Sequence, residues 1–566
     1  MGEFVDLKAK PYNLSDEDVA WVEDTIAGMS IEEKIGQLFI SHNRNLDVDE
    51  AQEKISKYHY GGQRYKDAGS AARDVFDFTT GLREVAKIPM LVAANCDNGG
   101  DGACEEGVYV ASGAACEASG DENVSYGAGL VAGETCRAIG VNWNFDPCVD
   151  ILYNWRNTIV NTRAYGTDAD TVLKHTRAYL RGITENGLAT CVKHFPGDGT
   201  EERDQHLILG VNELSVEEWE ESFGKVYRTL IDDGLHSIMV GHIALPEYSK
   251  KLRPEFTDDD IMPATLAPEL LTDLLKGQLG WNGLTITDAS HMIGFAAAMK
   301  RKDAVPRCIA AGCDMLLFFR DEDEDYESMM AGYRDGVITD ERLHDALRRI
   351  LGVKASIGLH RGEHTPTEEG LSVIGSEKHL EIARDAADKA ITLVKNTQDQ
   401  LPITPATHPR IELRYLSMEE AGGIYASGGA LDMIKEELEA VGFQVTYARG
   451  DMRIGGKVSD YVRDFDATFT FCDLRGYASE NAYRIRWANP MSADIPWQVW
   501  EKPVVFIGMN WTTHLYDVPM VKTFINSYKN TREVVRQTIQ KIMGESEFKG
   551  TPNELVWCGG LWEAKR

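Results

Sequence analysis

One short loop of the sequence carries a carboxylate and an imidazole close enough together to act as a pair. Asp204 and His206 lie two residues apart in a polar segment. In an extended segment, side chains at that spacing project from the same side of the backbone. The carboxylate would favour the charged form of the ring and fix its tautomer, as general acid–base catalysis requires. On most polar loops such a pair is only solvated, so the neighbouring residues must decide between the two interpretations.

The segment before this loop is typical of a strand whose end carries chemistry. Residues 188–192 form an apolar run that predicts a buried strand, and Lys193 and His194 follow it directly. Pro196 and the glycines after it then end regular structure. Strand ends of α/β folds collect ligand-binding groups, which favours a catalytic role for the loop.

The stretch from Lys193 to His206 reads KHFPGDGTEERDQH. It resembles the signature of glycoside hydrolase family 3, and specifically its β-N-acetylglucosaminidase branch, in which a Lys-His-Phe-Pro-Gly segment precedes a loop that ends in Asp-Ser/Thr-His. The resemblance implies that His206 is the acid/base and that Asp204 orients it. Two positions depart from many relatives, which have His where Asp198 stands and Ser or Thr where Gln205 stands.

A further carboxylate stands at the end of another predicted strand. Asp288 directly follows the apolar run 284–287. From its position alone, capping of a following helix is as good an interpretation as catalysis. In the family the nucleophile is an Asp at this place, after a strand and a Ser or Thr, and the run GWNGLTITD over 280–288 matches that pattern. The resemblance therefore implies that Asp288 is the nucleophile.

These residues predict retaining hydrolysis of a β-linked sugar. Asp288 would attack the anomeric carbon to form a covalent glycosyl-enzyme, and His206 would protonate the leaving oxygen and then deprotonate water. We expect an exo-acting β-N-acetylglucosaminidase that removes terminal GlcNAc from peptidoglycan- or chitin-derived fragments.

Three alternatives to this activity stay open. A neutral imidazole does not repel an anionic acceptor, so phosphate could replace water and make the enzyme a phosphorylase. A β-glucosidase-like specificity is disfavoured by the Asp-x-His loop. A catalytically silent carbohydrate-binding relative is disfavoured because Asp288, Asp204 and His206 are all present.

Sugar-binding residues are expected at the same strand ends. Lys193 and His194 can donate hydrogen bonds to ring hydroxyls. Arg163 stands in an Arg-x-Tyr-Gly segment that matches the family's Arg-x-Phe/Tyr-Gly, in which the Arg contacts sugar. Without that resemblance, Arg163 would be interpreted as a member of an ordinary loop salt bridge.

Two more positions are predicted to line the pocket. Asp97 follows the apolar run 90–94 beside several glycines, and the family places a sugar-binding Asp near here. This segment departs from the family's usual form, so Asn95 is an alternative to Asp97. His242 follows the run 237–240 and is either a pocket residue or a satisfied core histidine.

The elements that must position these residues alternate between strands and helices. Seven strand-like runs occur in the first 320 residues. Such alternation favours an eight-stranded barrel over a doubly wound sheet without deciding between them, and the resemblance implies the barrel. A polar stretch at 358–370 has linker composition, and further strand-like runs follow it. We predict an α/β protein with a (β/α)8 TIM-type barrel over 1–358, a linker over 359–380 and an α/β sandwich domain over 381–566.

Charge and cysteine usage limit the other partners. The formal net charge of −31 argues against nucleic acid and anionic membranes as partners. None of the ten cysteines forms a Cys-x-x-Cys pair, which argues against a structural zinc site. The acidic clusters at 258–260 and 321–325 lack the spacing of a calcium loop, and we expect no metal and no cofactor. The N-terminus has no basic region followed by an apolar one, and no window is as apolar and long as a membrane-spanning helix. The expected compartment is a reducing cytoplasm.

Overall fold

The computed structural model describes residues 5–65, 69–417, 429–448, 457–474, 482–485, 487 and 495–566. Contacts divide the chain into two compact units. The first comprises Met1–Tyr109, Ser125–Tyr153 and Thr167–Leu380, and the second comprises Val110–Val124, Asn154–Gly166 and Glu381–Arg566. The sequence predicted one boundary region, between 358 and 380. The main difference is that two short segments of the predicted barrel domain, Val110–Val124 and Asn154–Gly166, group with the second unit. The predicted domain limits stay a prediction.

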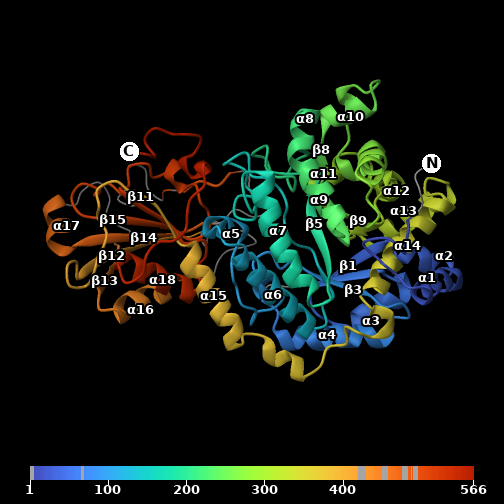
Figure 1. Ribbon diagram of the computed structural model, residues 1–566, viewed down its shortest axis with the longest axis horizontal. Coiled ribbons are helices and arrows are strands. Elements are labelled where there is room, and N and C mark those ends of the chain that lie inside the picture. The colour runs from blue at the N-terminus through green and yellow to red at the C-terminus, as the bar shows by residue number, and fades with distance from the viewer. Residues whose placement is uncertain are drawn as a thin grey trace. The chain divides into compact units, whose positions relative to one another are not determined.

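A closed barrel of eight parallel strands forms the centre of the first unit, which confirms the predicted architecture (Figure 1). Around the barrel the strands follow the order β1 (Phe39–Asn43), β10 (Met315–Leu317), β9 (Leu284–Ala289), β7 (Ser237–Val240), β5 (Ala189–Phe195), β4 (Trp143–Asn144), β3 (Leu91–Ala94) and β2 (Gly62–Tyr65). Strands of this kind are covered on both faces, so most of them appear in the sequence as continuous apolar runs.

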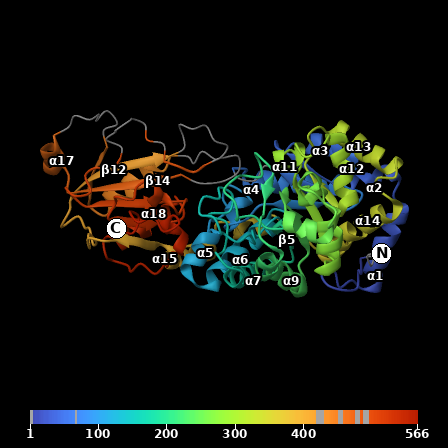
Figure 2. The ribbon, with the colours of Figure 1, turned by 90° about the horizontal axis from the view of Figure 1, so that it is seen from above.

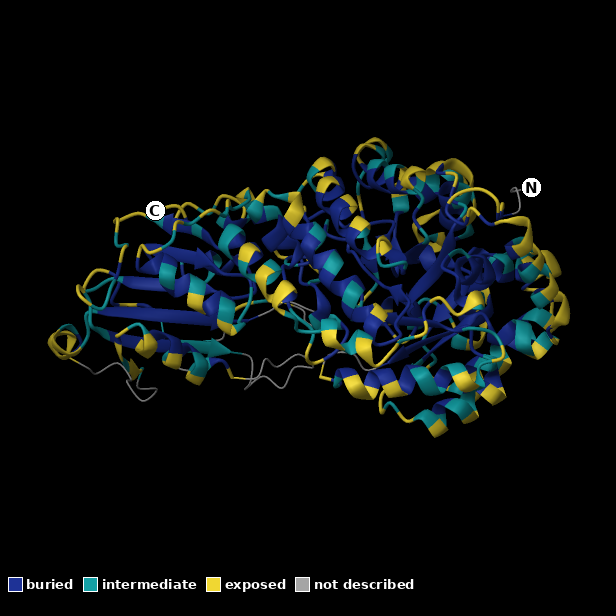
Figure 3. Ribbon diagram, turned by 60° about the horizontal axis from the view of Figure 1, so that its bottom comes forward, coloured by how far each residue is buried: buried dark blue, intermediate teal, exposed yellow. Residues whose placement is uncertain are grey.

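Helices surround the barrel strands (Figure 2). Several of these helices carry buried residues along one side and exposed residues along the other (Figure 3). The α-helices of this part of the chain are α1 (Asp16–Gly28), α2 (Ile31–Gly36), α3 (Val48–Tyr58), α4 (Ala72–Val85), α6 (Glu122–Ala138), α7 (Ala169–Thr184), α8 (Val216–Trp219), α9 (Lys225–Asp233), α10 (Pro246–Leu252), α11 (Ile293–Ala296), α12 (Arg301–Ala311), α13 (Glu322–Arg334) and α14 (Asp340–Ser356).

Two strands of the barrel differ from the sequence expectation. The first of the seven strand-like runs covers residues 35–40 and predicted a strand there, but Ile35 and Gly36 end helix α2, which begins at the capping box of Ser30 and Glu33. The strand starts only at Phe39. The eighth strand, β2, was not found because Gly-Gln-Arg-Tyr has no apolar run, although all four residues are buried.

A six-stranded mixed sheet forms the second unit. Its order is β11 (Thr392–Asn396), β16 (Thr523–Asn526), β15 (Val504–Gly508), β14 (Ala467–Asp473), β12 (Arg410–Ser417) and β13 (Gln444–Tyr447), with only β11 antiparallel to its neighbour. The helices are α5 (Gly113–Ser119), α15 (Glu377–Ala390), α16 (Leu431–Ala440), α17 (Val458–Asp464) and α18 (Arg532–Ile542). The separate α/β domain is therefore confirmed. Among the described residues, no helix has the length and apolar character needed to cross a membrane.

Candidate active site

Three neighbouring barrel strands deliver the central residues of the candidate site. His194 lies on β5 and Asp288 on β9, and β7, which ends just before His242, pairs with both strands. All three residues stand at the carboxyl ends of their strands. In parallel barrels the reactive groups gather at this end, because the loops that follow the strands meet there.

Asp288 is a nearly buried carboxylate surrounded by imidazoles. It is 8% exposed, and its Oδ1 accepts a hydrogen bond from the amide of Ala289 at 2.7 Å. Burial would raise the pKa of this carboxyl, but the nearby rings of His194, His242 and His206 outweigh it and lower the pKa below the ordinary value. Asp288 is therefore ionised at neutral pH, as a nucleophile must be.

Asp150 fixes the ring of His194 toward Asp288. Its Oδ2 lies 2.7 Å from His194 Nδ1, and its Oδ1 accepts the main-chain amides of His194 at 3.1 Å and Asp198 at 2.8 Å. The carboxylate of Asp150 can only accept a hydrogen bond, so Nδ1 of His194 carries a proton. The other ring nitrogen, Nε2, faces Asp288 Oδ2 at 3.9 Å. Burial would raise the pKa of Asp150, but His194 and these hydrogen bonds lower it.

Lys193 forms a buried ion pair that the sequence did not indicate. Its Nζ lies 2.6 Å from Asp146 Oδ1, and the two side chains are 2% and 0% exposed. Asp146 follows β4, the strand next to β5. The predicted sugar-binding role of Lys193 stays a prediction, and in this structure its ammonium group is held by Asp146.

The predicted dyad is formed in the loop after β5. His206 Nδ1 lies 2.7 Å from Asp204 Oδ1, and the same oxygen accepts the amide of His206 at 2.8 Å. The side chain of Asp204 is fully buried, whereas that of His206 is 27% exposed. Because the carboxylate holds the Nδ1 proton, Nε2 is the ring atom that can exchange a proton with a substrate.

Gln205 fastens this loop to the strand ends on both sides. Its Oε1 accepts the amide of His242 at 2.8 Å, and its Nε2 donates to Asp198 Oδ2 at 3.3 Å. The carbonyl of Gln205 also accepts the amide of Gly294 at 3.3 Å. A Cβ at Gly294 would lie 2.7 Å from the Cβ of His242, so only glycine permits this close approach. The two positions that depart from many relatives, Asp198 and Gln205, thus contact each other.

His242 is a buried histidine with both ring nitrogens bonded inside the protein. Its Nε2 lies 3.0 Å from the carbonyl of Ala289, and its Nδ1 lies 3.0 Å from Thr265 Oγ1. A carbonyl only accepts, so Nε2 carries the proton of the neutral ring. Burial lowers the pKa of His242 to about 4. Of its two predicted roles, the geometry favours a core histidine whose ring nitrogens are both hydrogen-bonded inside the protein. Its main-chain amide holds Gln205 of the loop that carries His206.

Asn95 and Asp97 are both partly buried. Asn95 Oδ1 accepts two hydrogen bonds from the guanidinium of Arg64, from Nε at 3.1 Å and Nη2 at 2.9 Å. Arg64 lies on β2, the strand that the sequence did not reveal. The amide oxygen of Asn95 is thus engaged by Arg64, and the choice between Asp97 and Asn95 as the sugar-binding residue stays a prediction.

The remaining predicted residue, Arg163, lies in the segment Asn154–Gly166 of the second compact unit. It is 9% exposed, and its amide donates to the carbonyl of Val160 at 3.0 Å. Its sugar-binding role therefore stays a prediction from the family motif.

Cys148, Asp150 and His194 bring together three kinds of metal-ligating atom. These atoms all lie within 4.8 Å of one another, and the residues are buried. The thiol of Cys148 donates to Asp150 Oδ2 at 3.1 Å, the same oxygen that accepts from His194. Hydrogen bonds within the group thus explain its arrangement, and Asp150 acts as the acceptor that joins the ends of β4 and β5.

Sequence reasoning missed Asp146 and Asp150, although a signal for both was present. Asp146 follows the apolar run 141–145 directly, which is the position that singled out Lys193 and Asp288, and Asp150 lies four residues further on. The same rule applied to this strand end would have found them.

The barrel segment also matches a known family model. Residues 30–353, more than half of the chain, match the model described as the glycosyl hydrolase family 3 N terminal domain. The chain belongs to glycosyl hydrolase family 3.

Relatives within family 3 carry more than one activity name. Over 561 residues the chain is 41% identical to the beta-N-acetylglucosaminidase/beta-glucosidase of Cellulomonas fimi, with 98% of this chain and 99% of that protein covered. The solved structure of the beta-glucoside phosphorylase BglX is 36% identical, with a TM-score of 0.92 and coverage of 97% of this chain and 99% of that one. A family 3 beta-N-acetylglucosaminidase from Paenibacillus sp. str. FPU-7 is 22% identical and shares the fold, with a TM-score of 0.78 over 93% of this chain and 98% of that one.

For this family 3 protein, the comparisons confirm the resemblance and the enzyme class. They do not decide between GlcNAc and glucose as the sugar, or between water and phosphate as the acceptor. The roles of Asp288, Asp204 and His206 stay predictions that rest on the geometry above.

Proposed function

We propose that the protein is a retaining, exo-acting β-N-acetylglucosaminidase that releases terminal β-linked GlcNAc from peptidoglycan- or chitin-derived fragments. The observation that carries the proposal is the pairing of an ionised Asp288 at one strand end with an Asp204-oriented imidazole on the neighbouring loop. The near full-length similarity to the Cellulomonas fimi protein, whose name includes β-N-acetylglucosaminidase, supports the sugar.

In the first step, Asp288 attacks the anomeric carbon while His206 donates the Nε2 proton of its imidazolium to the leaving oxygen. Asp204 stabilises that imidazolium and keeps the ring oriented. In the second step, His206 takes a proton from water as the water attacks the glycosyl-enzyme. Two inversions at the same carbon return the β configuration. Asp97 and His194 are the groups that we assign to the sugar hydroxyls.

Phosphorolysis at the same residues is the second candidate. The proton-transferring group is an imidazole, which does not repel a phosphate as a second carboxylate would. The 36% identity to a beta-glucoside phosphorylase over nearly the whole chain favours this variant as well.

We further infer a cytoplasmic setting, because all ten cysteines are buried free thiols, as in proteins of reducing compartments.

Turnover of the 4-nitrophenyl β-glycosides of GlcNAc and of glucose, with and without phosphate, tests the proposal. Release from the GlcNAc compound alone, independent of phosphate, is the expected result for a hydrolase. Strong stimulation by phosphate, with sugar 1-phosphate as the product, would establish the phosphorylase instead. No release from either glycoside would contradict both functions.

A further inference from the structure

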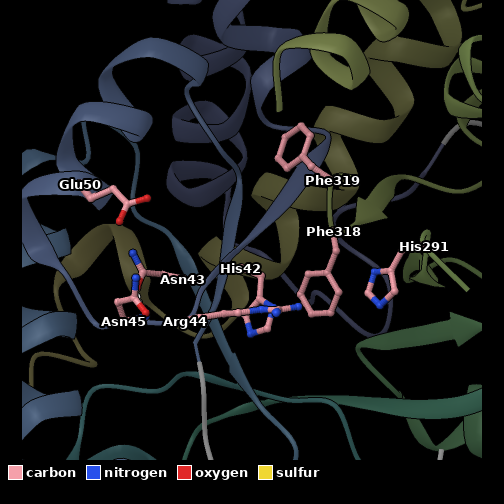
Figure 4. A pocket seen from close by; sticks show the side chains of 8 residues that line it. All are labelled: His42, Asn43, Arg44, Asn45, Glu50, His291, Phe318 and Phe319. Carbon is pink, nitrogen blue, oxygen red and sulfur yellow. Dashed lines mark hydrogen bonds between the residues drawn. The ribbon is translucent and has the colours of Figure 1, made fainter. Parts of the chain in front are cut away.

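Cavities lie at both ends of the barrel. The pocket in Figure 4 lies at the carboxyl ends of β1 and β10, and Arg44 and His291 line it. A second cavity of about 250 Å³ lies at the opposite end, where β3 and β4 begin. The end of α4, the residues that open β3 and β4, and the turn after α14 enclose it. We call this second hollow the amino-end cavity.

Most of the wall of the amino-end cavity is apolar. Four buried hydrophobic side chains contribute to it, namely Leu82, Met90, Val92 and Leu359. The one amide side chain in the wall, Asn142, is engaged on both sides. Its Nδ2 donates to the carbonyl of Met90 at 3.1 Å, and its Oδ1 accepts the amide of Val92 at 2.9 Å. These surfaces suit the apolar body of a ligand.

A single guanidinium faces this apolar wall. Arg83 is half-buried near the end of α4 and lines the cavity, and its Nη2 donates to the carbonyl of His364. In the part of the chain that the structure describes, this guanidinium has no carboxylate partner. A guanidinium carries five N–H groups, so most of them are left for solvent or for a ligand.

Other shielded arginines of the first unit do have carboxylate partners. The buried Arg349 donates from Nε to Asp345 Oδ2 at 3.1 Å. The largely buried Arg301 donates from Nε to Asp325 Oδ1 at 2.7 Å. Withdrawing a charge from water is costly unless an opposite charge or hydrogen bonds compensate for it. Arg83 bears part of this cost without such a partner, and burial lowers its pKa.

The groups around Arg83 leave the potential in the amino-end cavity positive. Burial and nearby arginines, Arg83 among them, lower the pKa of His364 to about 4, so this imidazole is neutral at pH 7. The wall residue His360 leads to a carboxylate, Asp18, whose Oδ1 is shared by His360 Nε2 at 2.8 Å and Arg361 Nη1 at 2.6 Å. The charge of Asp18 is therefore already compensated, and an anion beside Arg83 is favoured.

We propose that the amino-end cavity binds a small monocarboxylate with an apolar body, whose carboxylate pairs with Arg83 and whose body packs against the apolar wall. A cavity of about 150 Å³ holds benzene, so one of about 250 Å³ has room for a ring that carries a carboxylate. One cation among apolar side chains favours a singly charged acid over phosphate and over a neutral sugar. The site is independent of the proposed glycosidase activity.

The place of the cavity in the barrel makes binding measurable as stability. β3 runs from this cavity to Asn95, and β4 runs from it to Phe145 and Asp146. An occupant therefore bridges α4, two barrel strands and the turn after α14. A ligand that binds only the folded chain stabilises it by mass action, so occupancy should raise the midpoint of thermal unfolding.

Benzoate is the probe, and isothermal titration and thermal unfolding of the full chain are the measurements. Acetate has the carboxylate without the body, and benzamide has the body without the charge. We expect benzoate to bind and to raise the unfolding midpoint, and both controls to bind about tenfold or more weakly. No binding of benzoate, or equal binding of benzoate and benzamide, would overturn the proposal.

Two arginine variants locate the bound benzoate. Arg83→Gln should weaken benzoate binding about tenfold or more, because a charge-assisted hydrogen bond is lost. Arg44→Ala removes the exposed cation of the pocket in Figure 4 and should bind benzoate like the wild type. The reverse result would place benzoate on the side of Asp288 and overturn the assignment to the amino-end cavity.

A filling variant tests the cavity without touching the charge. Ala86 is half-buried where α4 ends and lines the cavity, so Ala86→Leu reduces the space beside Arg83. We expect weaker benzoate binding and an unfolding midpoint without ligand close to that of the wild type. Unchanged benzoate binding in Ala86→Leu and Arg83→Gln would overturn the site. None of these outcomes depends on glycoside turnover, so the proposed function can fail or stand separately.

Discussion

A single oxygen of Asp204 binds His206 twice. Oδ1 lies 2.7 Å from the Nδ1 of His206 and 2.8 Å from its main-chain nitrogen. The carboxylate therefore fixes both the tautomer and the orientation of the ring relative to its own backbone. Loss of this one oxygen should disturb proton transfer without removing the imidazole.

We predict that Asp204→Asn lowers kcat by a factor on the order of 10² to 10⁴, because an amide can stabilise neither the imidazolium nor its tautomer. In kcat/KM, which reports the formation of the glycosyl-enzyme, the loss should shrink for a 2,4-dinitrophenyl leaving group, which needs no proton. Rates for phenyl and 2,4-dinitrophenyl glycosides in the variant and in the wild type provide the measurement. An equal loss on both substrates would argue against acid catalysis through His206.

Replacement of the nucleophile should abolish turnover. In Asp288→Ala we expect kcat to fall by at least about 10⁴-fold, because no group remains to attack the sugar. Added azide should attack from the vacated side and yield the α-glycosyl azide, which mass spectrometry and NMR would identify. Asp259→Ala removes an exposed carboxylate and serves as the control. Near wild-type turnover by Asp288→Ala would disprove the assignment.

The pH profile should respond to His194. The surrounding imidazoles lower the pKa of Asp288 against the effect of burial, so the nucleophile stays ionised down to a low pH. In His194→Gln this pKa rises again, and Asp288 is protonated sooner as the pH falls. The acid limb of kcat/KM therefore shifts to higher pH, whereas His344→Gln, at a half-exposed site, leaves it in place. An unshifted acid limb in His194→Gln would exclude this coupling.

The ion pair of Lys193 and Asp146 should matter for stability. Lys193→Met leaves a buried carboxylate without its cation, which costs about 3 to 5 kcal/mol. The double variant Lys193→Met with Asp146→Leu should recover most of the loss, because both charges are gone. Urea unfolding followed by the barrel's fluorescence measures both. A variant of normal stability with a raised KM would instead support the predicted contact of Lys193 with sugar.

His242 should make the protein sensitive to acid. Its pKa is lowered to about 4 in the folded chain, against 6.5 in the unfolded chain. Between these values the unfolded state binds a proton that the folded state does not, so stability is present above pH 6.5 and is lost as the pH falls toward 4. The contribution is about 3 kcal/mol. His242→Asn should show a flatter dependence of the unfolding midpoint on pH, and an identical slope would contradict this origin.

The sequence predicted those parts of the fold that depend on local pattern. The apolar runs of β5, β9 and β15 identify buried strands, because parallel strands are covered on both faces. β2 contains Gln63 and Arg64, and its burial depends on partners distant in the chain, so no local pattern reveals it. The eighth strand was implied only by the family resemblance.

In the candidate site, too, contacts between residues close in the sequence were predictable, and contacts between distant residues were not. The pairing of Asp204 with His206 was predictable because spacing of two residues is local. The pairing of Lys193 with Asp146 joins the ends of two different strands, and sequence separation hides it. His242 is a third case, because the sequence predicted the residue but not its role. The role depends on Thr265 and Ala289, which contact its ring and come from distant parts of the chain.

The hydrogen bond between Asp198 and Gln205 has a consequence for how this loop evolves. Each side chain is nearly fully buried, and Gln205 has its other polar atom engaged by His242. An exchange at one position leaves a buried polar group at the other without its match, which is destabilising. The two sites are thus epistatic. We therefore expect a loop with His and Ser or Thr at these positions to be reached through a less stable intermediate, unless both residues change together.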